Sequence, residues 1–134
     1  MSVKSLKSQK KNKKNFFHSF IWASNGIKEC FKREINFRFH IFMTFMVALF
    51  SFLFRVKPTE FIILLFCIST VLISELINTL TEEICNLISE EYNEKIKYIK
   101  DLSAGMVLIS AIFSAVTGLI IFIPHLISFL ERII

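Results

Sequence analysis

The sequence predicts an all-α integral membrane protein with three transmembrane helices and an N-terminal amphipathic helix on the membrane surface. Apolar residues make up 54% of the 134 residues, and 16 residues are Phe. These residues gather in three long runs that are almost free of charge, and a helix needs about 20 such residues to cross hydrocarbon. Since this length suits a single domain, we expect a basic, disordered tail over 1–15 and one membrane domain over 16–134.

The first expected element is the surface helix, over residues 16–33. Six apolar side chains share one helical face, and four polar ones point away from it. The apolar set is Phe16, Phe17, Phe20, Ile21, Ile27 and Phe31, and the polar set is His18, Asn25, Glu29 and Lys32. Helices with aromatic anchors and lysines lie in the membrane interface. A helix packed on a soluble partner is the alternative, but a spanning segment follows within a few residues.

The three expected spans cover about residues 35–55, 60–88 and 103–130. The first span carries no charge after Arg38 except that of His40, which depends on pH. Pro58 then ends one helix and favours the start of the next, which makes the link between the first two spans a tight turn. The link between the second and third spans is too charged to be buried.

Lys and Arg residues predict the orientation of these spans. Residues 1–38 hold ten of the 16 basic residues, and the 85–105 loop holds three more. Three spans place these two segments on the same side, which is therefore cytoplasmic. The net charge of +5 comes mainly from the N-terminus. Because these lysines adjoin a membrane segment, they favour anionic lipid and not nucleic acid as a partner.

Cysteine and histidine residues indicate neither a disulfide framework nor a metal cluster. Cys30, Cys67 and Cys85 are unevenly spaced and form no CxxC pattern. We therefore expect them to pack as small apolar residues.

A polar seam on the second span carries the candidate chemistry. At 100° per residue, five polar residues fall within about a third of the helix circumference. They are Glu75, Asn78, Thr79, Glu82 and Asn86, and the opposite side has Leu76, Ile77, Leu80 and Ile84. Asn and Thr can simply hold membrane helices together. A buried Glu is a poor adhesive without a cation or partner, so the two carboxylates favour a functional site.

Charged residues from three segments are predicted at one depth, the cytoplasmic interface: Glu34, Glu82, Lys100 and Asp101. Two carboxylates from different helices suit Mg²⁺ that shares phosphate oxygens, and a lysine can neutralise phosphate charge. Glu75 lies about two turns, or roughly 10 Å, deeper than Glu82. There it could take a proton from a lipid hydroxyl. This arrangement suits lipid phosphorylation, and ordinary interfacial charge is the alternative.

The same residues resemble the prokaryotic diacylglycerol kinase family, in particular its Gram-positive undecaprenol kinases. The matching motifs are Glu75-Leu76-Ile77-Asn78-Thr79 with Glu82, then Glu91-Tyr92, then Lys100-Asp101-Leu102-Ser103-Ala104-Gly105. The N-terminal half agrees through Asn25-Gly26-Ile27, Glu34, Asn36-Phe37-Arg38 and His40. The resemblance covers residues 16–130, and it implies a homotrimer whose active sites are shared between protomers.

The resemblance also implies a role for each matching residue. Glu75 corresponds to the catalytic base and, with Ala104, to the lipid-substrate site. Glu34 and Glu82 correspond to the metal ligands. The ATP-binding set is Trp22, Glu34, Asn78, Glu82, Asn86, Glu91, Tyr92, Asn93, Lys100 and Asp101. The implied partners are ATP with Mg²⁺, a membrane lipid alcohol and further copies of the chain in the cell membrane.

Three departures from the family pattern leave alternatives open. Asn86 stands where the family usually has Asp, Thr81 replaces an apolar residue, and Leu80 replaces Ala. A missing carboxylate at position 86 could weaken nucleotide or metal binding. The chain could then be a degenerate member that binds lipid or nucleotide without turnover. A channel is a further alternative, but the sparse polar residues of 106–130 do not suit a pore. The sequence does not distinguish undecaprenol from diacylglycerol.

Overall fold

The computed structural model describes residues 16–89 and 91–132, and every regular element among them is an α-helix. The helices are α1 (Phe16–Arg33), α2 (Ile35–Leu53), α3 (Pro58–Ile88) and α4 (Glu94–Leu130). The tail expected over residues 1–15 lies outside the described residues. Helices α2, α3 and α4 are each long and apolar enough to cross a membrane, as the sequence predicts.

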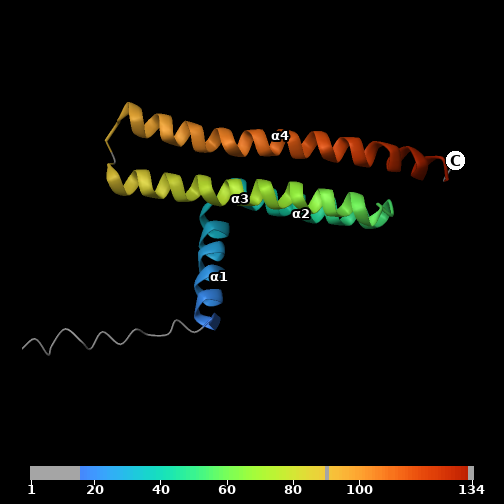
Figure 1. The fold of residues 1–134 in the computed structure, drawn as a ribbon, viewed down its shortest axis with the longest axis horizontal. Helices are drawn as coiled ribbons and strands as arrows, with labels where there is room; N and C mark the ends of the chain where they lie inside the picture. Colours follow the sequence, from blue (N-terminus) through green and yellow to red (C-terminus); the bar gives the residue numbers. More distant parts are fainter. Residues whose placement is uncertain (1–15, 90, 133–134) are drawn as a thin grey trace, which may run out of the picture.

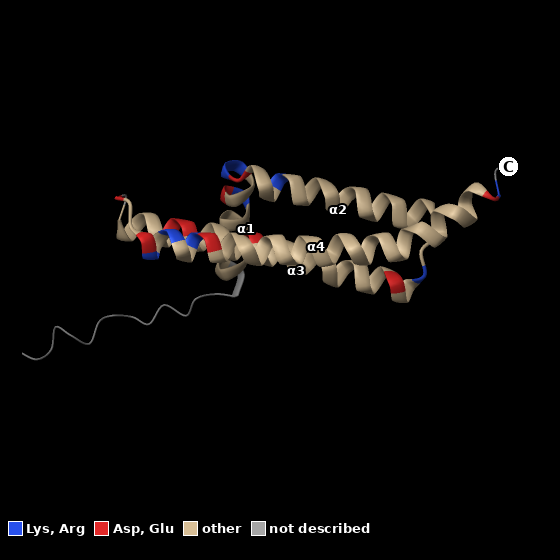
Figure 2. Cartoon of the chain, turned by 90° about the horizontal axis from the view of Figure 1, so that it is seen from above, with Lys and Arg blue, Asp and Glu red and all other residues tan. Residues whose placement is uncertain are grey.

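Helices α3 and α4 form a long antiparallel hairpin, and α2 runs beside α3 (Figures 1 and 2). Helix α1 projects sideways from the bundle where α2 begins (Figure 1). The change of direction occurs at Glu34, whose extended backbone (φ −96°, ψ 116°) separates the two helices. The Glu34 amide donates to the Cys30 carbonyl at 2.8 Å and so continues the hydrogen-bond pattern of α1. Helix α1 therefore ends where the bundle begins.

Local sequence explains the other two chain reversals. Pro58 occupies the first turn of α3, where its missing N–H costs nothing. At the other reversal, Asn93 caps α4 because its side-chain oxygen accepts from the amides of Lys95 and Ile96. This cap lets α4 begin at Glu94, well before the span expected from residue 103. The charged first turns of α4 thus extend the helix beyond its apolar part.

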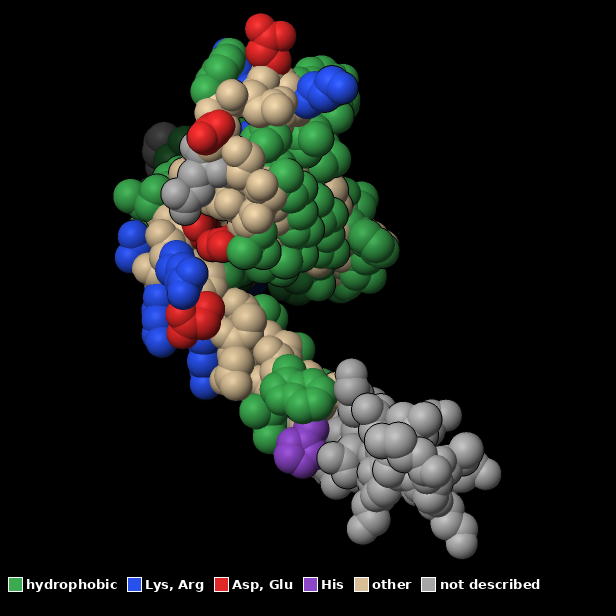
Figure 3. All heavy atoms as spheres, turned by 90° about the vertical axis from the view of Figure 1, so that its left-hand side faces the viewer, with side chains coloured by type: hydrophobic (Ala, Val, Ile, Leu, Met, Phe, Trp, Pro, Cys, Tyr) green, Lys and Arg blue, Asp and Glu red, His purple; other side chains and the backbone are tan. Residues whose placement is uncertain are grey.

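The bundle is apolar on its outer surface, and several of its buried side chains are polar. Phe45, Phe52, Phe66 and Phe113 are all more than half exposed, whereas Ser51, Glu75, Asn78 and Ser103 are buried. Figure 3, which views the bundle from the α3–α4 loop, shows hydrophobic side chains over one flank and charged ones gathered toward α1. An exposed surface this apolar needs lipid or further protein around it.

Candidate active site

Glu75 lies at the centre of the polar site, on α3 and facing inward. It is 3% exposed, and its Oε1 atom is 3.3 Å from His40 Nε2 on α2. A buried carboxylate is costly unless other groups compensate for it. His40 is the one ion-pairing partner of Glu75 that the described residues supply.

One helical turn from Glu75, Asn78 joins α3 to α4. Its Nδ2 donates to Glu82 Oε1 at 3.0 Å, and its Oδ1 accepts from the Ser103 hydroxyl at 2.7 Å. Ser103 is 2% exposed, so this network lies between the two helices and is shielded from water. The network orients the Asn78 amide and aligns the Glu82 carboxylate along the seam.

Glu34 brings a third carboxylate toward this region from the α1–α2 junction. Its carboxylate and that of Glu82 are close enough to Glu75 to repel its charge. No salt bridge engages Glu34 or Glu82 within the described part of the chain. Glu34 and Glu82 could each supply a carboxylate oxygen to Mg²⁺, which completes its shell with water and phosphate oxygens. Among the described residues, no group of three or more His, Cys, Asp or Glu side chains could hold a metal ion. Water and phosphate oxygens would therefore have to supply the other ligands.

The junction beside Glu34 is connected to α3 at two places. Cys30 Sγ lies 3.7 Å from Thr79 Oγ1, and Arg33 lies 3.6 Å from the Glu83 carboxylate. Burial raises the pKa of the Cys30 thiol, so the thiol stays protonated at neutral pH. These contacts hold the base of α1 against the seam.

Lys100 and Asn86 form the water-facing end of the site. Lys100 Nζ donates to Asn86 Oδ1 at 2.7 Å, which links the first turns of α4 to the end of α3. This contact holds the ammonium group of Lys100 beside the end of α3. Asp101 follows Lys100 in sequence and is exposed.

The remaining residues of the predicted nucleotide site lie on α1, in the link between α3 and α4, and on α4 itself. Glu91 and Tyr92 are exposed, and the Asn93 side chain caps α4. Trp22 is 53% exposed on α1, and the twelve residues to Glu34 extend about 18 Å along a helix. Ala104 is exposed on α4 beside Ser103.

Two residues of the site, His40 and Ser103, had no role in the sequence analysis. His40 stands in an apolar helix, and Ser103 is a small residue in a motif, so neither has a periodic signal that predicts its partner. Only the packing of α2 and α4 against α3 brings them to Glu75 and Asn78. A polar residue in an uncharged span is nevertheless a signal that could have singled out His40.

The site has three parts along α3. Buried Glu75 is at one end, the hydrogen bonds among Asn78, Glu82 and Ser103 are in the middle, and Lys100 is at the exposed end. Such a line can accept a proton at its deep end and bind a polyanion at its shallow end. A substrate at the deep end would be apolar, because the helix surfaces around Glu75 are apolar.

Comparison with known proteins assigns the chain to a family. The prokaryotic diacylglycerol kinase family matches residues 21–122. Undecaprenol kinase of Bacillus subtilis is 36% identical over 111 residues, which cover 83% of this chain and 90% of that protein. Diacylglycerol kinase of Synechocystis sp. is 32% identical over 115 residues, or 85% of this chain and 66% of that protein. The chain therefore belongs to the prokaryotic diacylglycerol kinase family, as its motifs predict, and is a membrane lipid kinase.

Proposed function

We propose that this kinase transfers the γ-phosphate of ATP to the primary hydroxyl of a membrane lipid alcohol, with undecaprenol as the substrate. The observation that carries the proposal is the row of three polar contact groups along α3: Glu75 with His40, Asn78 with Glu82 and Ser103, and Asn86 with Lys100. Undecaprenol is the preferred substrate because the match to this chain covers 90% of the length of an undecaprenol kinase. Diacylglycerol, the lipid in the name of the relative that is 32% identical, is the second candidate substrate.

In this proposal Glu75 is the general base. Its carboxylate accepts the proton of the lipid hydroxyl, the hydroxyl oxygen bonds to the γ-phosphorus, and the bond from that phosphorus to the bridging oxygen breaks to release ADP. His40 holds the Glu75 carboxylate from the side of α2. The acyl or prenyl chains of the lipid would lie against the apolar helix faces, with Ala104 beside them.

The phosphates of ATP are assigned to the shallow end of the line. Lys100, oriented by Asn86, neutralises their charge, and Asn78 offers an amide one turn from the base. Glu34 and Glu82 would hold Mg²⁺, which when bound with ATP neutralises the phosphate oxygens. Trp22, Glu91, Tyr92, Asn93 and Asp101 remain proposed nucleotide contacts.

We also propose that the active unit is a homotrimer in the cell membrane, with sites shared between protomers. Trp22 lies on α1, which projects from the bundle, and could reach the seam of a neighbour. The basic N-terminus and the 89–93 loop would face the cytoplasm, and ATP is available there. The exposed apolar side chains of α1, including Phe20 and Phe31, suit a helix lying on the membrane.

A phosphate-transfer assay in lipid bilayers, with radiolabelled ATP and both lipids in parallel, tests the proposal. Glu75→Gln should retain less than about a hundredth of the wild-type rate, because general-base catalysis contributes at least that factor. Glu131→Gln is the control, since Glu131 is an exposed carboxylate at the other end of the bundle and makes no ion pair with a described residue. Transfer by Glu75→Gln above that level would exclude Glu75 as the base. ATP binding by the wild type without transfer to either lipid would favour a degenerate binding protein.

A further inference from the structure

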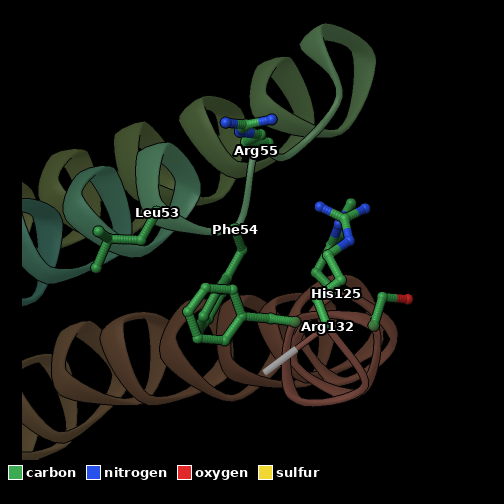
Figure 4. Close-up of a pocket in the computed structure, with 7 residues that line it drawn as sticks. Leu53, Phe54, Arg55, His125 and Arg132 are labelled. Atoms are coloured by element: carbon green, nitrogen blue, oxygen red, sulfur yellow. The ribbon is translucent and has the colours of Figure 1, made fainter. Parts of the chain in front are cut away.

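A second polar site lies at the opposite end of the bundle, around the α2–α3 turn and the last turns of α4. Figure 4 shows Arg55 on the turn, His125 on α4 and Arg132 just after α4, and these residues line a cavity of about 380 Å³. Glu60, in the first turn of α3 at this end, is fifteen residues from Glu75, or about 22 Å along the helix. The cavity is therefore separate from the proposed active site.

Both arginines of this cavity are available to bind an anion. Neither Arg55 nor Arg132 makes an ion pair with any described residue. Two acidic groups lie at the same end. Glu60 lies 2.8 Å from Nε2 of His125, which lines the cavity, and accepts the Lys57 amide at 3.1 Å, and Glu131 precedes Arg132 in the sequence. Neither carboxylate lies within ion-pair distance of Arg55 or Arg132.

The backbone at Arg55 is unusual and supports a role for its side chain. Arg55 has a φ of 54°, in the left-handed region that glycine normally occupies. Its amide donates to Phe52 O and that of Val56 to Ser51 O, the two hydrogen bonds of a Schellman motif at the end of α2. Glycine is the favoured residue at this position of the motif. Arginine at this position therefore carries local backbone strain, and such strain often marks functional positions.

The rest of the cavity wall is aromatic and apolar. Phe54 packs on Phe50, Phe122 and Phe129, with ring centroids 5.7, 6.3 and 5.3 Å apart. It is thereby wedged between the end of α2 and α4, with Leu53 beside it. Guanidinium groups next to aromatic rings at the end of a span match the headgroup region of a bilayer, where charge meets the first methylenes of lipid tails.

We propose that this cavity binds an anionic phospholipid of the leaflet opposite the active site. Arg55 and Arg132 bind the phosphodiester oxygens of the headgroup, and Leu53, Phe54 and Phe129 contact the glycerol end of the acyl chains. A soluble anion would contact only the two arginines, whereas a lipid would contact both the arginines and the apolar side chains of the cavity.

The test uses the full-length protein reconstituted in bilayers of phosphatidylcholine and phosphatidylglycerol, with retained lipids counted by native mass spectrometry. Wild type should retain phosphatidylglycerol over phosphatidylcholine. Arg55→Gln and Arg132→Gln should each lower that ratio by about tenfold, the factor for one lost hydrogen bond between charged groups. Lys57→Gln is the matched control, since Lys57 is a cation of the same turn that does not line the cavity. It should leave the ratio unchanged.

Arg55→Gly separates binding from folding. Glycine relieves the positive φ, so the thermal midpoint should hold or rise while phosphatidylglycerol retention falls. Three results would overturn the proposal. They are unchanged retention in the double arginine variant, an equal loss in Lys57→Gln, and displacement of the lipid by excess inorganic phosphate at constant ionic strength, which would indicate a soluble-anion site. None of these readouts depends on kinase activity.

Discussion

The Ser103→Ala substitution tests whether the hydrogen-bond network between α3 and α4 organises the active site. Ser103 donates to Asn78 Oδ1 at 2.7 Å, and Asn78 Nδ2 donates to Glu82 at 3.0 Å. Without the hydroxyl, the amide oxygen loses its interhelical partner. The Asn78 amide is then held only from the Glu82 side and can rotate away from its present orientation.

The size of the effect follows from burial. An unsatisfied buried acceptor costs about 1–3 kcal/mol in soluble proteins, whereas interhelical hydrogen bonds in membranes average about 0.6 kcal/mol. Ser103 is 2% exposed and Asn78 9%, so few substitute partners reach them. We therefore expect a loss of about 1 kcal/mol in the free energy of unfolding, equivalent to roughly fivefold in the equilibrium constant.

Denaturant unfolding in mixed micelles measures the stability, and lipid phosphorylation titrated with Mg·ATP measures the site. We expect kcat/KM to fall by about the same fivefold factor. Ser110→Ala is the matched control, because the Ser110 hydroxyl donates only to Val107 O of its own helix. If Ser103→Ala and Ser110→Ala behave alike in both measurements, the network does not position Asn78 and Glu82, and the reasoning is refuted.

Three further predictions concern the proposed active site. Glu34→Ala and Glu82→Ala should each raise the Mg²⁺ concentration for half-maximal activity, Glu82→Ala the more; unchanged half-saturation in both would remove them from the metal site. Mixing Glu75→Gln with Glu34→Ala subunits should restore some activity if sites are shared, and no rescue in verified mixed assemblies would favour sites within single subunits. Asn86→Asp should lower KM for Mg·ATP or leave it level, because a carboxylate keeps Lys100 oriented and can reach the metal shell. A marked rise in that KM would contradict the assignment of Asn86 to the nucleotide site.

The membrane architecture could be predicted from the sequence because it depends on local properties. Long uncharged runs must form helices in hydrocarbon, since the bilayer offers no other partner for backbone polar groups. The three spans are accordingly found as helices α2, α3 and α4. The face shared by Glu75, Asn78 and Glu82 likewise follows from the 3.6-residue period, and Glu75 and Asn78 are indeed buried.

The contacts across the helices depended on tertiary packing. Periodicity states which residues share a face of one helix, but not which residue of a second helix meets them. The pairs His40–Glu75, Ser103–Asn78 and Lys100–Asn86 follow from the register of α2 and α4 against α3. The Arg55 and Arg132 cavity joins residues far apart in the chain for the same reason. Spans are determined by hydropathy along the chain, whereas sites between spans are determined by how the helices pack.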